Sequence, residues 1–369
     1  MRCVLPFLLC IGLSGFVPAQ QATNLVEELW LNHAELLAVE RKPEMEAKEV
    51  IAAGKTMRFL EKTFGTKPAT GWSLYISMHG GGGAPPRVNN GQWKNQIRLY
   101  QPKEGIVVAP RAPTDTWNLW HQGHIDDLFD RLIENYVVLR EVNPDRIYLL
   151  GYSAGGDGVY QLAPRMADRF AAASMMAGHP NDANPLGLRN LPFMIWCGEK
   201  DAAYKRNQVA KKWGERLEEL QAADADGYLH KTTIVKGAGH WMNGTDRAAI
   251  PWMGKHKRDP WPKEVVWHQS GRTHERFYWL QNEQPVKGQT IKATVEKQTL
   301  TIQADGIEKL TLRLSDSLVD LDSPVRVIFN GERVHDAIVP RSSAVVKASL
   351  AERADPRSAA SALLQVQVK

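Results

Sequence analysis

Between residues 71 and 258, short apolar runs alternate with patterns typical of amphipathic helices, and this alternation constrains the fold more than any other feature. The candidate strands are 72–78, 105–109, 146–150, 171–176, 192–197 and 230–235. Between them, residues 125–139 show the spacing of one apolar helix face. Strands that alternate with helices favour a mostly parallel sheet covered by helices on both faces. We therefore predict an α/β domain over residues 66–260.

The segments on either side of this domain show different patterns. Residues 20–65 are predicted to be an N-terminal helical segment divided at Pro43, because apolar residues recur at spacings of three and four: Val50, Ala53, Met57, Leu60 and Phe64. After Pro262 apolar and polar residues alternate, and Asn330-Gly331 signals a two-residue hairpin. Residues 261–369 are therefore predicted to form an antiparallel β-rich accessory domain, whose last strand holds Leu364, Val366 and Val368.

The first 19 residues are typical of a secretory signal peptide. Arg2 supplies a positive charge, residues 3–13 form an apolar centre, and Val17-Pro18-Ala19 offers a cleavage site. The apolar stretch is too short to span a bilayer, so we expect no membrane anchor. We predict that residues 1–19 are removed and that the mature protein is secreted or periplasmic.

Charge and cysteine content narrow the function classes. The formal charge of +5 is spread along the 369 residues, and no stripe of basic and aromatic residues suggests a nucleic-acid partner. Of the three cysteines, only Cys197 remains after the predicted cleavage, so the mature chain cannot form an internal disulfide. An exported protein of this kind must depend on its core for stability.

The sequence Gly151-Tyr152-Ser153-Ala154-Gly155-Gly156 directly follows the predicted strand 146–150. Glycines on both sides of a serine permit a sharp strand-to-helix turn that exposes the hydroxyl. Such a hydroxyl is a poor nucleophile unless a base accepts its proton. Ser153 is therefore a candidate nucleophile if an acid and a histidine follow it in the chain.

Both partners follow at the ends of later predicted strands. Asp201 comes just after 192–197 and is the preferred acid, with Glu199 and Asp182 as alternatives. His240 follows 230–235 in a loop between Gly239 and Trp241, and it is the predicted base.

An oxyanion hole is expected upstream of the serine. The run His79-Gly80-Gly81-Gly82-Gly83 directly follows the predicted strand 72–78. Backbone N–H groups of Gly81 or Gly82, together with that of Ala154, are the predicted donors to a developing negative oxygen.

These elements, in this order, resemble the α/β-hydrolase superfamily. Three segments are similar to a secreted esterase and predicted-peptidase group near the feruloyl, acetylxylan and polyhydroxybutyrate esterases. They are Asn143-Pro144-Asp145-Arg146-Ile147-Tyr148 before the serine, and Gly156-Asp157-Gly158-Val159-Tyr160 and Asp168-Arg169-Phe170-Ala171-Ala172 after it. The resemblance covers about half of the chain. It implies the α/β-hydrolase fold and ester hydrolysis through an acyl-enzyme.

Several aromatic and histidine side chains are predicted to shape the site. Residues that follow the ends of parallel strands border a ligand, so the candidate substrate contacts are Trp117, Trp120, His179 and Trp241. Two alternatives stay open: Trp117 and Trp120 suit a cap on the core equally well, and His179 suits a hydrogen bond that holds its loop. His121 and His124 stand three apart, but no third ligand has convincing spacing, and we predict neither a metal nor a cofactor. The aromatics around Trp267 and Trp279 suit either a glycan-binding face or packing between domains.

The prediction is a secreted serine ester hydrolase, with esters on polysaccharides as one candidate substrate class. Two alternatives remain open. A serine peptidase would use the same three residues, although no propeller-like repeat is present. An inactive binding protein of the same fold is opposed by the retention of every catalytic element.

Overall fold

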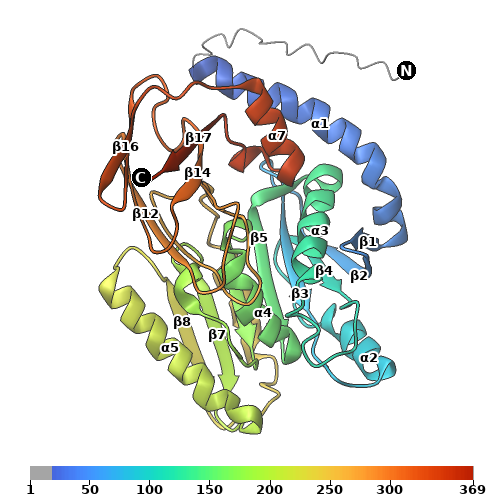
Figure 1. Cartoon of the computed structure of the whole chain (residues 1–369). Helices are drawn as coiled ribbons and strands as arrows, with labels where there is room; N and C mark the ends of the chain where they lie inside the picture. The colour runs from blue at the N-terminus through green and yellow to red at the C-terminus, as the bar shows by residue number, and fades with distance from the viewer. Residues whose placement is uncertain (1–18, 369) are drawn as a thin grey trace, which may run out of the picture.

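The computed structural model describes residues 19–368, and an eight-stranded sheet organises the α/β part of the chain (Figure 1). The strand order is β1-β2-β4-β3-β5-β6-β7-β8. The strands are β1 (Glu49–Ala52), β2 (Lys55–Phe64), β3 (Trp72–Met78), β4 (Gly105–Pro110), β5 (Val142–Tyr152), β6 (Ala172–Met176), β7 (Phe193–Gly198) and β8 (His230–Val235). From β4 to β8 every neighbouring pair is parallel, whereas β2 is antiparallel to both β1 and β4. The mostly parallel sheet expected from the sequence is confirmed.

Helices cover both faces of this sheet, whose central strands are buried on both sides. The helices are α2 (Pro86–Gln96), α3 (His124–Arg140), α4 (Ala154–Arg165), α5 (Arg206–Ala223) and α6 (Ala249–Met253). Leu74 and Ile76 of β3 pack in the same cluster as residues of α3, α4 and α5. Tyr75, which lies between them in the sequence, packs instead with residues of α2 and α6. Alternate side chains of a strand point to opposite faces, so one strand supplies two cores.

The predicted N-terminal helical segment is wrong over residues 49–64. Helix α1 (Ala19–Ala47) contains Pro43 rather than ending there, and the chain then forms the antiparallel pair β1–β2 at the sheet edge. Ala53 and Gly54 both adopt positive φ, at 48° and 67°, which is the geometry of a two-residue hairpin. Val50 and Met57 face each other across this hairpin and are fully buried. The spacing that resembled a helix comes from two short strands joined at a tight turn.

The C-terminal part forms two further sheets and one helix. The four-stranded sheet has the order β10-β11-β14-β17, and the five-stranded sheet has the order β16-β15-β13-β12-β9. The elements are β9 (Glu264–His268), β10 (Arg276–Phe277), β11 (Leu280–Gln281), β12 (Thr290–Glu296), β13 (Thr299–Ala304), β14 (Lys309–Leu314), β15 (Val325–Phe329), β16 (Glu332–Ala337), α7 (Ser343–Arg353) and β17 (Ala362–Gln367).

The predicted hairpin at Asn330-Gly331 is confirmed, because it joins β15 to β16 with both residues at positive φ. The expectation of an entirely antiparallel domain is wrong at one pair, since β13 and β15 are parallel. Residues 305–324 connect β13 to β15 and include β14 of the other sheet. Because this connection leaves the sheet and comes back, β15 can lie beside β13 and run in the same direction.

The C-terminal domain packs directly on the α/β domain. One apolar cluster runs continuously from α3 and α4 into the sheets of the C-terminal domain. Trp267 and Trp279, 2% and 0% exposed, lie inside that cluster, so the glycan-binding reading of these aromatics is wrong and the packing reading is correct. Helix α1 contacts α7, and Trp30 packs near Val346 and Leu350 (Figure 1).

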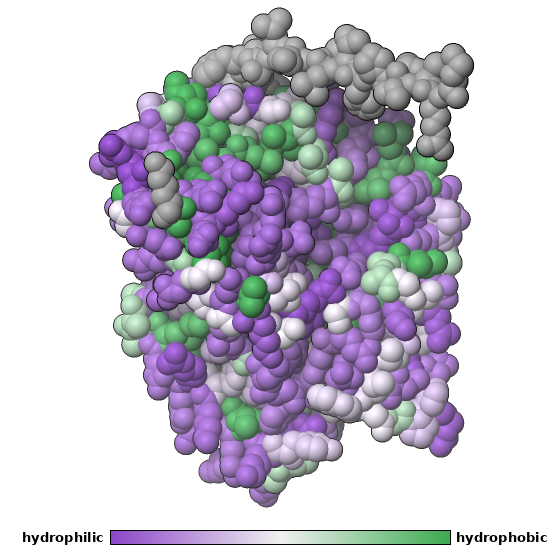
Figure 2. Space-filling view, viewed as in Figure 1, coloured by the Kyte–Doolittle hydropathy of each residue, from purple (hydrophilic) through white to green (hydrophobic). Residues whose placement is uncertain are grey.

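Hydrophilic side chains cover most of the face shown in Figure 2, and the hydrophobic residues on it gather mainly near its upper part. Helix α1 leaves Leu31, Leu36 and Val39 exposed. Over residues 19–368, no helix combines the length and apolarity needed to cross a bilayer. The predicted signal peptide lies outside the described residues except for Ala19, where α1 begins.

Candidate active site

Ser153 occupies a tight turn between β5 and α4. Its φ is 60° and its ψ is −122°, a backbone conformation that a side chain rarely adopts. Larger residues in place of the surrounding glycines would clash with the backbone. A Cβ on Gly155 would lie 2.2 Å from the carbonyl oxygen of Met78, and a Cβ on Gly151 would lie 2.3 Å from the carbonyl oxygen of Gly155. The backbone N–H of Ser153 donates to Met176 O of β6 at 2.9 Å. The turn therefore presents Ser153 at the carboxyl end of the sheet.

The structure brings Ser153, His240 and Asp201 into a hydrogen-bonded line. His240 Nε2 lies 3.0 Å from Ser153 Oγ, and His240 Nδ1 lies 2.8 Å from Asp201 Oδ2. Asp201 is 2% exposed and sits in the loop after β7, whereas His240 follows β8 and is open to solvent. This arrangement can pass a proton from the serine hydroxyl to the imidazole while the buried carboxylate orients the ring.

The alternative acids lie elsewhere. Glu199 Oε2 accepts the N–H of Gly237 at 2.7 Å and supports the loop before His240. Asp182 Oδ1 accepts from Gln161 Nε2 of α4 at 3.1 Å. Neither carboxylate bonds His240, so the geometry favours Asp201.

Tyr152, which the sequence reasoning did not single out, fixes the histidine loop. Its hydroxyl donates to His240 O at 2.6 Å and accepts the N–H of Met242 at 3.1 Å. Its ring also packs edge-on against the imidazole of His240, with ring centroids 5.9 Å apart. The available signal was an aromatic residue with a polar tip directly before the candidate nucleophile.

The glycine loop after β3 approaches Ser153 as expected, but its two predicted donors are not equivalent. A Cβ on Gly80 would lie 3.1 Å from Ser153 Cβ, so the loop and the turn are in contact. The N–H of Gly82 already donates to Asn89 Oδ1 at 3.1 Å. Ala154 is the first residue of α4, where backbone N–H groups have no partner within the helix. The geometry therefore favours Gly81 and Ala154 over Gly82 as oxyanion donors.

Asn89 and His79 hold this loop, and sequence reasoning missed both. Asn89 is fully buried, and its Nδ2 donates to Gly82 O at 2.9 Å and to Asp115 Oδ1 at 2.7 Å. Burial lowers the pKa of His79 to about 4, so its ring is neutral. Its Nε2 accepts the N–H of Ala112 at 3.2 Å, which leaves the proton on Nδ1 to donate to Gly80 O at 2.6 Å.

Trp120 was predicted to contact substrate, and the structure contradicts this. Its side chain is 0% exposed, and its Nε1 donates to His79 O at 2.9 Å. The indole therefore braces the glycine loop from inside the core.

Two clefts flank Ser153. The first has a volume of about 550 Å³ and is lined by Val88, Leu99, Tyr152, Ser153, His240 and Trp241, among others. The second has a volume of about 440 Å³ and is lined by Gly81, Trp117, Ala154, Asp157, His179 and Arg206, among others. Three of the four predicted substrate contacts thus border these clefts, with Trp241 in the first and Trp117 and His179 in the second.

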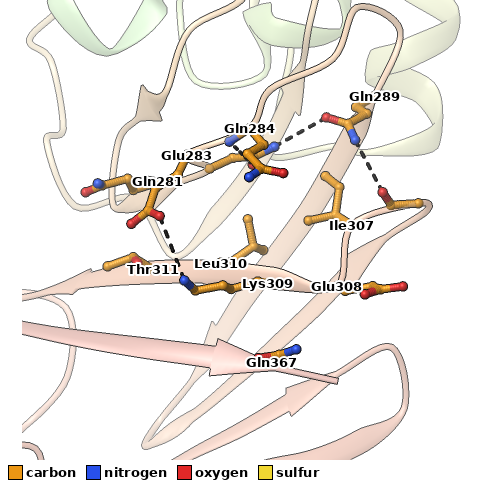
Figure 3. Close-up of a pocket in the computed structure, with 12 residues that line it drawn as sticks. Gln281, Glu283, Gln284, Gln289, Ile307, Glu308, Lys309, Leu310, Thr311 and Gln367 are labelled. Atoms are coloured by element: carbon orange, nitrogen blue, oxygen red, sulfur yellow. Dashed lines mark hydrogen bonds and ion pairs between the residues drawn. The ribbon is translucent and has the colours of Figure 1, made fainter. Parts of the chain in front are cut away.

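The C-terminal domain has a separate cleft of about 410 Å³ at the edge of its four-stranded sheet (Figure 3). Its lining is polar and includes several amides, and a Glu283–Lys309 ion pair of 3.8 Å crosses it. This lining contains no serine, cysteine or histidine. Over the described residues, no three His, Cys, Asp or Glu side chains converge as a metal site.

Comparison with known proteins gives relatives among the esterases. No family model matches the chain. The putative esterase NocK from Nocardia uniformis subsp. tsuyamanensis is 26% identical over 179 residues, which make up 44% of this chain and 52% of that protein. The chain thus spans about half the length of the curated relative it matches.

Solved structures with a similar arrangement include a thermostable esterase, with a TM-score of 0.43, 17% identity and coverage of 57% of this chain and 62% of that chain. A feruloyl esterase module from Clostridium thermocellum complexed with sinapinate has a TM-score of 0.37, 17% identity and coverage of 53% and 87%. The strand order, the serine turn and the esterase relative confirm that the chain resembles the esterases of the α/β-hydrolase superfamily, with the fold this implies.

Proposed function

We propose that the protein is a serine hydrolase that cleaves carboxylic esters through an acyl-enzyme. The observation that carries this proposal is the continuous line Ser153 Oγ–His240 Nε2–Asp201 Oδ2, with hydrogen-bond distances of 3.0 and 2.8 Å. The similarity to NocK, whose name describes a putative esterase, supports the ester class.

The proposed reaction follows from the positions of these groups. Ser153 Oγ attacks the ester carbonyl carbon while its proton passes to His240 Nε2, and the carbonyl oxygen becomes an oxyanion. Donors from Gly81 and Ala154 stabilise that oxyanion. The carbon–oxygen bond to the alcohol then breaks, and His240 returns the proton to the departing oxygen. Water then attacks the acyl carbon while His240 accepts one of its protons. The bond from that carbon to Ser153 Oγ breaks, His240 returns the proton to Oγ, and the carboxylic acid leaves.

We also propose that the protein is exported and that its natural substrates include esters on polysaccharides. Export is supported by Arg2, the apolar residues 3–13 and Val17-Pro18-Ala19. The polysaccharide class is supported by the motif resemblance to feruloyl and acetylxylan esterases. N-terminal sequencing of the exported protein tests the first part and should begin near Gln20.

A panel of substrates tests the central proposal. The mature protein should hydrolyse at least one of acetyl, feruloyl and hydroxybutyrate esters faster than peptide amides, and Ser153→Ala should reduce that activity by roughly 10⁴-fold. A fluorophosphonate probe should label the parent protein and the control Ser317→Ala, whose serine is exposed in the C-terminal domain, but not Ser153→Ala. Faster cleavage of peptides would favour a peptidase, and near-normal turnover by Ser153→Ala would refute the nucleophile.

A further inference from the structure

Arg206, the first residue of α5, is a nearly buried cation with unused hydrogen-bonding capacity. Its side chain is 11% exposed, and it makes no hydrogen bond to any of residues 19–368. Its nearest carboxylate oxygen, Asp201 Oδ1, lies 3.8 Å from Nη1, which makes a long ion pair but no hydrogen bond. Arg258, 1% exposed at its side chain, shows the usual arrangement: its guanidinium donates to Asp145 at 2.8 and 3.1 Å and to Asp168 O at 3.0 Å.

The guanidinium of Arg206 is held at the wall of the second cleft. Its carbon lies 4.8 Å from the ring centroid of Tyr204, which is itself 76% exposed. The same cleft contains Ala154, a proposed oxyanion donor, and the exposed indole of Trp117. The outer N–H groups of this guanidinium, which make no hydrogen bond to the described residues, thus belong to the same cleft as Ala154, whereas Nε is buried.

For an ester whose carbonyl carbon lies at Ser153 Oγ, the two clefts lie where its two halves would extend. His240 must protonate the departing alcohol oxygen, so the alcohol lies on the side of Ser153 that His240 and Trp241 line. The acyl group extends in the other direction from the carbonyl carbon. That direction leads past Gly81 and Ala154 into the cleft of Arg206.

We propose that the second cleft is an acyl subsite in which Arg206 binds a carboxylate carried at the far end of the acyl group. The preferred substrates are then half-esters of dicarboxylic acids, with the alcohol esterified to one end and the other end ionised. This inference rests on the proposed ester hydrolase function. A carboxylate would accept from the guanidinium in the paired geometry that arginine favours.

Asp157 shares the cleft and opposes this binding. Its Oδ1 accepts the N–H of His179 at 2.6 Å, and burial raises its pKa to about 6. At pH 7.5 the carboxyl is ionised and repels a second carboxylate. Asp157→Asn retains an oxygen for the His179 N–H and removes the charge, so it should strengthen the preference for anionic acyl groups.

The test compares two series of ethyl esters in a pH-stat at pH 7.5. The charged series is monoethyl succinate, glutarate and adipate, and the neutral series is ethyl butyrate, valerate and hexanoate. The measured quantity is the ratio of kcat/KM between charged and neutral esters. We expect Arg206→Met to lower the best ratio by roughly tenfold or more, Arg206→Lys to retain part of it, and Asp157→Asn to raise it. If the loss of Arg206 also disturbs Asp201, kcat/KM changes equally for charged and neutral esters, and the ratio between them stays the same.

Arg216→Met is the matched control, because Arg216 lies on the same helix with its side chain 53% exposed. It should leave the ratio as in the parent protein. If Arg206→Met has the same ratio as the parent protein, the proposed acyl subsite is wrong. If neither series nor the ester panel is hydrolysed, the proposed function itself fails, so the two failures are distinct.

Discussion

His274 Nε2 in the C-terminal domain lies 2.8 Å from Asp126 Oδ2 at the start of α3, and the same carboxylate pairs with Arg165 of α4. Asp126 is 1% exposed. Burial alone would raise its pKa, but the charge of Arg165 and the hydrogen bond from His274 outweigh burial and hold the pKa at about 2. One buried carboxylate thus links two helices of the α/β domain to the C-terminal domain.

Asp126→Asn should destabilise the protein by about 3–5 kcal/mol at pH 7, because it leaves the buried guanidinium of Arg165 without its counter-ion. Urea unfolding measures this loss. The neighbouring Asp127→Asn is the control: that side chain is 44% exposed and pairs only with Arg272 at the surface, so its loss should stay below about 1 kcal/mol. Equal effects of the two variants would contradict the role of Asp126.

Asp126 also gives the parent protein a specific acid sensitivity. Its pKa is lower in the folded protein, about 2, than the ordinary value of 3.8. The stabilisation is therefore complete above pH 3.8 and is lost as the pH falls toward 2. The difference in unfolding free energy between the parent protein and Asp126→Asn should shrink by about 2 kcal/mol over that interval. A difference that does not depend on pH would refute this assignment.

Glu134 of α3 should produce the opposite pH dependence. Burial raises its pKa to about 7 despite the nearby charges of Arg169 and Arg41. A raised folded pKa gives stability that is complete below the ordinary value of 4.5 and is lost as the pH rises through 7. Between pH 4.5 and 8, the parent protein should lose about 3 kcal/mol relative to Glu134→Gln. Urea unfolding at both pH values checks this, with the exposed Glu218→Gln expected to follow the parent protein.

Asp201→Asn should lower kcat by roughly 10⁴-fold while the protein remains folded. The amide can no longer hold His240 in the tautomer that accepts a proton from Ser153. Steady-state kinetics on a p-nitrophenyl ester, with a thermal melt of the same sample, measures both quantities. Glu199→Gln and Asp182→Asn should each retain most of the activity, and a large loss in either would show that the acid is misassigned.

Asn89→Ala should lower kcat more than it raises KM, because Asn89 holds Gly82 through both its Oδ1 and its Nδ2. Without it the loop that presents Gly81 is less well fixed, and a loss of roughly 10–100-fold in kcat is expected. Asn90→Ala is the control, since Asn90 bonds Arg111 instead of the glycine loop. A rise in KM at constant kcat would place Asn89 in substrate binding rather than in positioning the oxyanion donors.

Local patterns in the sequence were sufficient for the strands of the α/β domain and for the order of Ser153, Asp201 and His240. A strand buried on both faces must be a short apolar run, and β3, which is buried almost throughout, has the predicted bounds for that reason. The turn at Ser153 is readable because Gly151 and Gly155 contact the backbone so closely that no larger residue fits. Constraints of this kind act over a few residues and so leave a local signature.

The residues that sequence reasoning missed or misplaced depend on contacts that only folding creates. Tyr152 acts through His240, 88 residues away, and its place before the candidate nucleophile was its one local signal. Asn89 acts through Gly82, which is only seven residues away but lies on the other side of a loop. Trp120 could equally have lined a cleft, and only the bond from its Nε1 to His79 O shows that it faces the core. The strands β1 and β2 were misread because a helix stripe and a hairpin share similar apolar spacings over fifteen residues or so, and the sheet edge beside β4 decided between them.

The sequence by itself thus determined the fold of the α/β half and the order of its candidate reactive residues, because glycine contacts and two-sided burial restrict the amino acids at many of its positions. Only the tertiary structure decided which backbone N–H groups are free near Ser153, and which cleft contains the guanidinium of Arg206, which makes no hydrogen bond to the described residues. Those properties depend on which donors and acceptors long-range packing has already paired, and such pairing leaves no periodic pattern in the chain.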